Sequence, residues 1–456
     1  MSGEILSLLL FAVSWGVLLL GFPVAFGLAG SALAFALVGS WLDVFDLRLL
    51  GSLPLRFYAT LTNEVLVAIP LFIFMGVLLE RSRLGEELLE TMGALFGRVR
   101  GGLGYAVIIV GMLLAATTGI IGATVVTMGL ISLPGMMRAG YDPRLACGTI
   151  CAAGTLGQII PPSIVLVILG DTLQGVNAQA QLAMGNFAPD PISVVDLFAG
   201  AILPGLVLVA IYIGYQAAVA ILQPGRCPAI VRTRPVAAEQ LLWSLLVPVA
   251  LIVAVLGSIL FGLATPTESA SVGAVGTILI CALRRRLGGD TLVETMRATL
   301  RMTSMIYVIL FGASVFSLVF VGLGGEKLVH DTLHALPGGP TAAMAVVMLL
   351  VFLLGFALDF IEIVVIVVPI VGPALLVMGI DPLWLGIMLA VNLQTSFLTP
   401  PLGPALFYLR GVAPPEVSSK AMYAGAWPFV WLQLLGLGVL WLFPGLATWL
   451  PSVLLN

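Results

Sequence analysis

The sequence predicts an all-α integral membrane protein with about ten to twelve membrane segments in two inverted repeats. Composition, apolar block length and an internal duplication predict this fold class. The 456 residues include 19 Lys and Arg and 22 Asp and Glu, so 9% are charged against about 25% in soluble domains. Hydrophobic residues make up 60%. This composition excludes a soluble enzyme, a disordered chain and a nucleic-acid-binding protein.

The first 50 residues are predicted to form two scaffold helices. We expect the first, at 5–20, to be retained, because Glu4 is the only early charge and a signal peptide needs a basic segment before its apolar core. The chain then turns at Gly21 and Pro23 into a second helix that ends near Trp41. Each span needs about 20 apolar residues.

Charged or proline-rich breaks separate the remaining apolar blocks. These blocks lie at 54–79, 103–137, 145–170, 197–223, 241–262, 266–283, 303–323, 341–378, 383–409 and 423–450. The polar stretches 80–102, 171–196 and 223–240 are predicted to be loops or linkers. The last of them falls at the midpoint of the chain, where a protein of two halves would have its seam.

An internal duplication relates the two halves. A Pro, five intervening residues, a Gly, one further residue and an Asp-Pro pair occur at Pro134 to Pro143 and again at Pro373 to Pro382. Seventeen residues separate each Asp-Pro pair from a Pro-Pro pair, and every matched position differs by 239. Such identical spacing indicates a pair of structural repeats.

The orientation of the repeats depends on the block at 303–323. If it is a re-entrant hairpin, the repeats are inverted, and if it spans the membrane, they are parallel. The small residues from Phe311 to Ser314, and also the glycines at 322–325, offer turns that favour a hairpin, with 54–79 as its partner turning near Ile69 and Pro70. We therefore expect scaffold helices at 1–50, a first repeat at 51–223, connecting helices at 224–283 and a second repeat at 284–456. Inverted repeats with broken helices are typical of secondary transporters.

The two Pro-Pro pairs are candidate ion-binding elements. Inside a helix they would free the carbonyls of Gly157, Gln158, Ser396 and Phe397, and a freed carbonyl in hydrocarbon needs a partner. Na⁺ is one candidate, and a kink satisfied by hydroxyls or water is the alternative. The candidate binding residues of these segments are Gln158, Pro161, Pro162, Ser163, Asn392, Gln394, Thr395, Thr399, Pro400 and Pro401.

Two long blocks are predicted to contain broken helices. The block at 103–137 is too long for one straight span, and its centre offers Thr117, Thr118, Gly119, Gly122 and Thr124 as an unwound segment with hydroxyl ligands. The matching block at 341–378 carries Asp359 and Glu362, which the i, i+3 spacing would place on one helical face. Intramembrane acids are candidates for binding a cation or a proton, or for pairing with an arginine.

Other polar residues are weaker candidates. Asn63 and Glu64 precede an apolar run, so they either line a site or are solvated at a loop end. Glu268 is expected to be a helix cap or to make an interhelical hydrogen bond. His330 and His334 are expected in a polar loop without a third metal ligand, and the four cysteines are expected to be packing residues.

The sequence also limits the energy source. The two lysines, Lys327 and Lys420, are not part of a Gly-Lys-Ser/Thr motif, so the chain has no P-loop for ATP. Transport would then be driven by an ion gradient or by another subunit. We predict neither enzyme activity nor a covalent cofactor.

Three segments resemble the large membrane subunit of tripartite ATP-independent periplasmic (TRAP) transporters. They are NEVLVAIPLFIFMGVLLE, GTLGQIIPPSIVL and LQTSFLTPPLGPALFYLRG, and the likeness extends over about 5–450. The resemblance implies an elevator-type, Na⁺-driven importer of a small organic anion in the bacterial inner membrane. It also implies two partners, a small four-helix membrane subunit and a periplasmic binding protein.

The resemblance further implies where Na⁺ and substrate bind. The re-entrant hairpins and unwound helices of that family correspond to 60–70, 117–124, 311–317 and 359–362, which adds Thr60 and Ser314 to the candidates. Two alternatives stay open: a single-component Na⁺/anion symporter, and a proton-coupled carrier or channel that uses Asp359 and Glu362.

Overall fold

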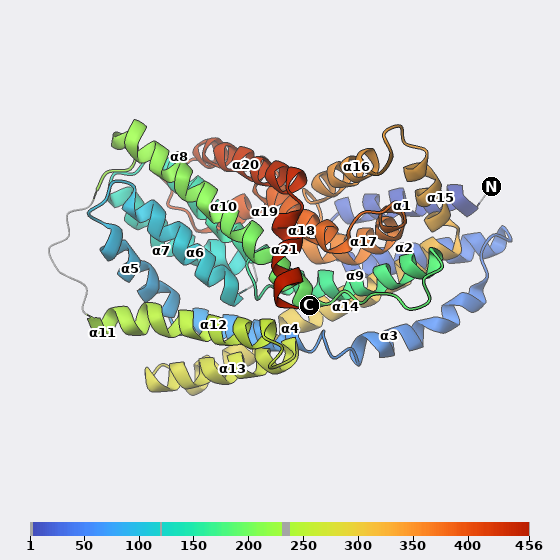
Figure 1. Ribbon diagram of the computed structural model, residues 1–456, viewed down its shortest axis with the longest axis horizontal. Coiled ribbons are helices and arrows are strands. Elements are labelled where there is room, and N and C mark those ends of the chain that lie inside the picture. The colour runs from blue at the N-terminus through green and yellow to red at the C-terminus, as the bar shows by residue number, and fades with distance from the viewer. Residues whose placement is uncertain (1–2, 119–120, 230–237, 456) are drawn as a thin grey trace. The chain divides into compact units, whose positions relative to one another are not determined.

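A computed structural model describes residues 3–118, 121–229 and 238–455 (Figure 1). Helices make up 81% of the structure, and the described ranges contain no β-strand. The predicted all-α fold class is therefore confirmed.

The helices follow one another with short connections. They are α1 (Gly3–Leu19), α2 (Val24–Trp41), η1 (Leu47–Ser52), α3 (Leu53–Leu61), α4 (Ala68–Arg81), α5 (Leu84–Phe96), α6 (Gly102–Thr118), α7 (Ile121–Arg138), α8 (Pro143–Thr155), η2 (Leu156–Gln158), α9 (Ile164–Ala183), α10 (Val194–Leu222), η3 (Pro224–Arg226), α11 (Ala238–Leu241), η4 (Leu242–Leu246), α12 (Val247–Leu260), α13 (Pro266–Leu283), α14 (Gly289–Gly322), α15 (Gly325–His334), α16 (Gly339–Leu354), α17 (Phe360–Val377), α18 (Pro382–Leu398), α19 (Pro404–Val412), α20 (Ser419–Leu442) and α21 (Gly445–Leu454).

Many of these helices can cross a membrane. Within the described residues, eight helical segments are long and apolar enough to span a bilayer, and five shorter apolar helices accompany them. Large apolar side chains such as Leu20, Trp41 and Phe187 are widely exposed, as expected of a surface that contacts lipid. The chain is a multi-pass membrane protein.

The chain forms two compact units, each built from three segments. Unit 1 comprises Met1–Val67, Ile168–Ser193 and Arg301–Gly386, and unit 2 comprises Ala68–Val167, Val194–Leu300 and Ile387–Asn456. Inside unit 1, α1 packs on α2, and α15 and α16 pack on α17. Inside unit 2, α8 packs on α20, α7 and α6, and α4 packs on α13. The predicted division into repeats at 51–223 and 284–456 stays a prediction.

The duplication seen in the sequence is also present in the local structure. Adding 239 to both bounds of α7 gives both bounds of α17, and adding it to the start of α8 gives the start of α18. The same shift carries α5 onto α15 and α6 onto α16, to within about two or three residues. The series from α3 to α9 therefore has a counterpart in the series from α14 to α19.

Each copy of the Gly-x-Asp-Pro motif ends one helix and begins the next. Gly140 and Gly379 have φ of +81° and +90°, a left-handed conformation that favours glycine. The residue after each glycine donates its amide to the carbonyl five positions back, which makes a Schellman turn. Asp142 then accepts from the Arg144 amide at 2.8 Å, and Asp381 accepts from the Trp384 amide at 2.7 Å.

The predicted turn at 311–314 is wrong, because α14 is continuous through this segment. A Cβ on Gly312 would lie 2.5 Å from the Ala25 carbonyl oxygen, so this glycine allows α14 to approach α2 closely. The Ser314 hydroxyl donates to the Leu310 carbonyl at 2.8 Å and stays within the helix. Small residues here serve helix packing.

Three other local predictions also need correction. The break between α3 and α4 falls at 62–67, and Pro70 lies in the first turn of α4, where its missing amide leaves no bond unmade. His330 and His334 belong to helix α15. Two of the stretches predicted to be loops are largely helical, because α5 lies within 80–102 and α9 continues through 171–196 as far as Ala183.

We predict that the two aspartate caps differ in their contribution to stability. Asp142→Ala and Asp381→Ala each remove a helix N-cap and should each lower the free energy of unfolding by about 1 kcal/mol. Asp142→Ala should cost slightly more, because Asp142 Oδ2 also accepts from Arg226 Nε at 2.7 Å. Thermal unfolding in detergent measures both effects. If Arg226→Ala does not remove the difference between the two variants, the ion pair contributes nothing.

Candidate substrate and ion site

A polar pocket of about 540 Å³ lies entirely within unit 1. Residues of α3, α9, α14, α15 and α17, together with the break after α3, line it. Its polar side chains are Arg56, Thr60, Asn63, Asp171, Thr172, Gln179, Ser314, Ser317 and Glu326. Hydroxyl, amide, carboxylate and guanidinium groups thus surround one space.

Asn63 organises the break in the chain beside this pocket. Its Oδ1 accepts from the Val65 amide at 2.9 Å, and its Nδ2 donates to Asp171 Oδ1 at 2.7 Å. The first bond satisfies the backbone where α3 has ended, and the second fixes a carboxylate of α9. One side chain therefore shapes both the break and the pocket wall.

The charged groups of the pocket are in different situations. Asp171 accepts from Asn63, and Glu326 Oε1 accepts from Gln179 Nε2 at 2.7 Å. Among the described residues, no carboxylate lies within ion-pair distance of Arg56. The two acids are thus held by amides, while the guanidinium is available to an anion.

The pocket brings together three of the predicted site residues, Thr60, Asn63 and Ser314. Sequence reasoning missed Arg56 and Asp171. Asp171 was assigned to a loop because the residues after it are polar, although it follows an apolar run without interruption. An acid within an apolar helix is a functional candidate by default, and this signal was present.

Asp359 and Glu362 form a capping box at the start of α17. Glu362 Oε2 accepts from the Asp359 amide at 3.0 Å, and Asp359 Oδ1 accepts from the Phe360 amide at 2.8 Å. The prediction that both lie on one helical face is wrong, since Asp359 precedes the helix. The broken helix itself is present, because α16 ends at Leu354 and α17 begins at Phe360. Among the described residues, no arginine pairs with either acid.

The matching segment of the first copy lies where α6 ends and α7 begins, and its residues 119 and 120 are outside the described ranges. Thr117 and Thr118 end α6, while Gly119 lies outside the described residues. Gly122 and Thr124 belong to the first turn of α7, and Thr124 is buried. A Cβ on Gly122 would lie 3.1 Å from the Tyr408 ring, so this glycine admits an aromatic ring from α19.

Both Pro-Pro pairs lie in connections between helices. Pro161 and Pro162 separate η2 from α9, and Pro400 and Pro401 separate α18 from α19. The premise that these prolines interrupt a continuing helix is therefore wrong. The segments contain helix ends instead, and their orphan carbonyls are a property of those ends.

Two of the four carbonyls proposed as Na⁺ ligands already accept hydrogen bonds. The Gln158 carbonyl accepts from Ser163 Oγ at 2.9 Å, and the Ser396 carbonyl accepts from the Thr399 amide at 3.1 Å. The Phe397 carbonyl faces Gly403, where a Cβ would lie 2.6 Å away. Gly157 lies in η2. A carbonyl oxygen has two lone pairs, so these bonds do not exclude a further partner.

The polar residues of α18 are buried and mostly bonded to their own helix. Thr395 donates to Val391, Thr399 donates to Thr395, and Ser396 donates to Leu393, at 2.8–2.9 Å. Each hydroxyl donates its hydrogen to a backbone carbonyl, so its oxygen lone pairs are left to accept a further bond. Asn392 is also buried. Such oxygens suit a hard cation.

A buried amide cluster in unit 2 was only partly anticipated. The Tyr212 hydroxyl accepts from Gln433 Nε2 at 2.7 Å and from Gln394 Nε2 at 3.4 Å, and Gln433 Nε2 also donates to Thr155 at 3.2 Å. The side-chain oxygens of Gln158, Gln394 and Gln433 are buried without a hydrogen-bond partner in the described part of the chain. Gln433 and Tyr212 escaped sequence reasoning because they lie on helices with no matched motif.

No transition-metal site is indicated. The described ranges contain no group of three or more His, Cys, Asp and Glu residues placed to hold a metal ion. The centroids of the His330 and His334 rings lie 4.2 Å apart on α15, with the rings tilted by 32°, and Glu268 forms a capping box with Thr265, which is one of the two predicted roles.

The family of the chain follows from comparison with known proteins. The profile of the DctM component of the tripartite ATP-independent periplasmic transporter matches residues 11–446. The chain belongs to this family. The TRAP large permease is thus a transporter subunit and not an enzyme.

Curated relatives agree with the assignment. The C4-dicarboxylate TRAP transporter large permease protein DctM of Vibrio cholerae is 32% identical, with 98% of each chain covered. The 2,3-diketo-L-gulonate TRAP transporter large permease protein YiaN of Escherichia coli is 27% identical, with 94% of each chain covered. The crystal structure of the Alcanivorax borkumensis YdaH transporter matches this permease with a TM-score of 0.63 at 17% identity over 88% of each chain, which shows a shared fold.

We predict that Tyr212→Phe destabilises the permease by about 1–3 kcal/mol, because it leaves a buried amide without its main acceptor. Tyr215→Phe is the matched control, since both rings pack edge to face on Phe429, at 5.5 and 5.2 Å. Thermal unfolding in detergent compares the two variants. Equal losses of stability would mean that the hydroxyl of Tyr212 contributes nothing specific.

Proposed function

We propose that this TRAP permease uses a Na⁺ gradient to import a small organic anion, most simply a carboxylate, across the bacterial inner membrane. The unpaired guanidinium of Arg56 in the polar pocket carries the proposal. A guanidinium binds carboxylate oxygens through paired hydrogen bonds, and the surrounding hydroxyls and amides suit the rest of a polar acid.

The names of the relatives support this substrate class. Those of Vibrio cholerae and Escherichia coli are named for a C4-dicarboxylate and a sugar acid, and one of Oleidesulfovibrio alaskensis is named for isethionate. All three compounds are organic anions. Which anion this permease carries depends largely on the binding protein that delivers it.

Two partners belong to the proposal. The family description names a tripartite, periplasmic system, and the isethionate relative is a DctMQ protein of which this chain covers 59%. We infer a small four-helix membrane subunit and a periplasmic binding protein. An elevator movement, with one part carrying the substrate past another, is the transport mechanism we propose for the two-unit chain.

Na⁺ is the coupling ion that the polar groups favour. The candidate oxygens come from hydroxyls, amides and backbone carbonyls, which are ligands for a hard cation. A proton-coupled carrier is the second candidate, because Asp359 and Glu362 are paired at one helix break and Glu362 is only 6% exposed. Both carboxylates already accept hydrogen bonds from backbone amides, so their role in the structure is to cap the start of α17.

The decisive experiment is uptake in proteoliposomes that contain the permease, its small membrane subunit and the binding protein loaded with a labelled acid. We expect uptake to require the binding protein and an inward Na⁺ gradient. Uptake by this chain alone would contradict the tripartite proposal. Uptake that continues without Na⁺ and stops with a protonophore would replace Na⁺ by protons.

Arg56→Gln should reduce uptake at low substrate concentration at least tenfold, because it removes a charge-assisted hydrogen bond to the anion. Arg56→Lys should retain part of the activity, since the charge stays but the planar fork is lost. Arg48→Gln is the control, as this exposed arginine of η1 lies outside the pocket. Equal activity of Arg56→Gln and Arg48→Gln would mean that the pocket does not bind the anion.

Asn392→Leu should abolish Na⁺-driven uptake without loss of folded protein, because it replaces a buried amide next to the proposed cation ligands with an apolar group. Thr118→Val should do the same where α6 ends in the first copy. Uptake and size-exclusion chromatography are measured together. Normal uptake in both variants would mean that these groups only pack.

A further inference from the structure

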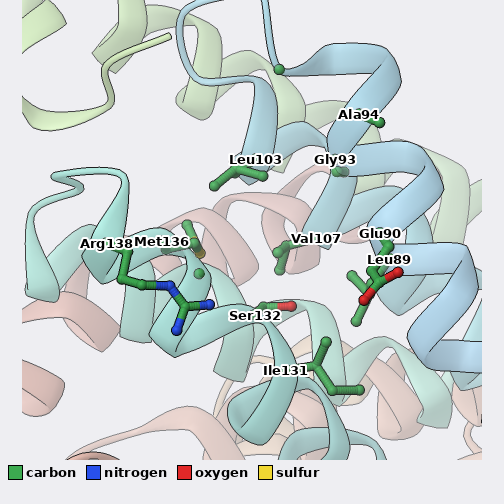
Figure 2. A pocket seen from close by; sticks show the side chains of 13 residues that line it. Leu89, Glu90, Gly93, Ala94, Leu103, Val107, Ile131, Ser132, Met136 and Arg138 are labelled. Carbon is green, nitrogen blue, oxygen red and sulfur yellow. The ribbon is translucent and has the colours of Figure 1, made fainter. Parts of the chain in front are cut away.

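A second pocket, of about 520 Å³, lies between α5, α6 and α7 within unit 2 (Figure 2). None of the candidate residues for substrate or ion binding lines it. Its volume is within the range of roughly 300–1,000 Å³ that small-molecule sites have. The pocket is therefore distinct from the candidate substrate and ion site.

The walls of this pocket suit a hydrocarbon chain. Apolar side chains such as Leu103 and Val107 line it, and small residues of α5 and α7 keep it open. Gly135 is the clearest case, because a Cβ there would meet nothing within 4 Å. The space beside Gly135 is thus not filled by any neighbouring side chain of the described structure.

One polar group lies unpartnered inside the pocket. Ser132 is 9% exposed, and its Oγ has no hydrogen-bond partner in the described part of the chain. Figure 2 shows its hydroxyl in the middle of the labelled side chains. A buried hydroxyl without a partner is costly, so a ligand with an acceptor oxygen would relieve it.

One end of the pocket carries the positive charge of Arg138, in the last turn of α7. No carboxylate of the described residues is within ion-pair distance of this guanidinium. Glu90 lies on the other side of the pocket, toward α5 (Figure 2).

We propose that this pocket binds an anionic phospholipid. Its phosphate lies on Arg138, the glycerol backbone passes Gly135 between α5 and α7, and the Ser132 hydroxyl donates to an ester carbonyl from which the acyl chain continues deeper. Ser132 and Arg138 are six residues apart on α7, or roughly 9 Å along the helix. That order, with a positive charge at the helix end and a hydroxyl donor deeper, matches a lipid whose headgroup lies at the membrane surface and whose ester carbonyl lies below it.

Lipid binding to the purified full-length permease in detergent tests this proposal. Native mass spectrometry should show phosphatidylglycerol binding at least tenfold more tightly than phosphatidylcholine with the same acyl chains. Arg138→Gln should remove this preference, and Ser132→Ala should weaken binding severalfold. Arg410→Gln, which changes an exposed arginine in the last turn of α19, should leave both unchanged. Equal binding of the two lipids, or a preference that survives Arg138→Gln, would overturn the proposal.

A second variant tests whether the lipid passes Gly135. Gly135→Leu fills the free space and should abolish phosphatidylglycerol binding, whereas Gly214→Leu on α10, another glycine with nothing within 4 Å, should not. Unchanged binding in Gly135→Leu would place the lipid elsewhere. If glycerol 3-phosphate competes at the lipid's own affinity, the site is for a free phosphate and the lipid proposal fails.

Discussion

The structure depends on satisfying backbone groups wherever a helix ends within apolar surroundings. An unpaired amide or carbonyl in hydrocarbon costs several kcal/mol, so each break needs a side chain that replaces the missing helical bonds. Asp359 and Glu362 cap α17 in this way, and Asn63 bonds the turn after α3, while Asp142 and Asp381 cap α8 and α18 at exposed helix ends. The chain has few charged residues, and several of them cap these helix ends.

The same requirement explains why the candidate sites lie at the breaks. A side chain that holds a helix end is fixed in position, and its remaining donors or lone pairs face the gap. The Asn63 side chain accepts a hydrogen bond from a backbone amide through its oxygen and donates one to Asp171 through its nitrogen. This one side chain therefore supports the backbone and forms part of the pocket wall. The hydroxyls of α18 likewise donate to carbonyls and keep their oxygens free to accept or to coordinate. Stability and binding therefore draw on the same residues.

Patterns that act locally were predictable from the sequence. Glycine, aspartate and proline at fixed spacing revealed the duplication, which the structure resolves into matching Schellman turns and caps, and apolar length located most helices. Tertiary context decided the rest. Read without its tertiary contacts, Gly312 suggests a turn, but in the structure it packs against Ala25. Asp171 is held at the pocket by a hydrogen bond from Asn63, which lies 108 residues away in the sequence. Neither partner can be found by reading along one segment.

The two copies are unequal where the polar pocket forms. Shifted by 239, Asn63 corresponds to Met302 and Asp171 to Arg410. Methionine cannot accept a backbone amide as asparagine does, and the second copy accordingly has no break, because α14 runs through the position where α3 ended. A pair of substitutions thus removes both the turn and its carboxylate partner. The duplication supplied the scaffold twice, whereas the polar pocket depends on side chains that only one copy carries.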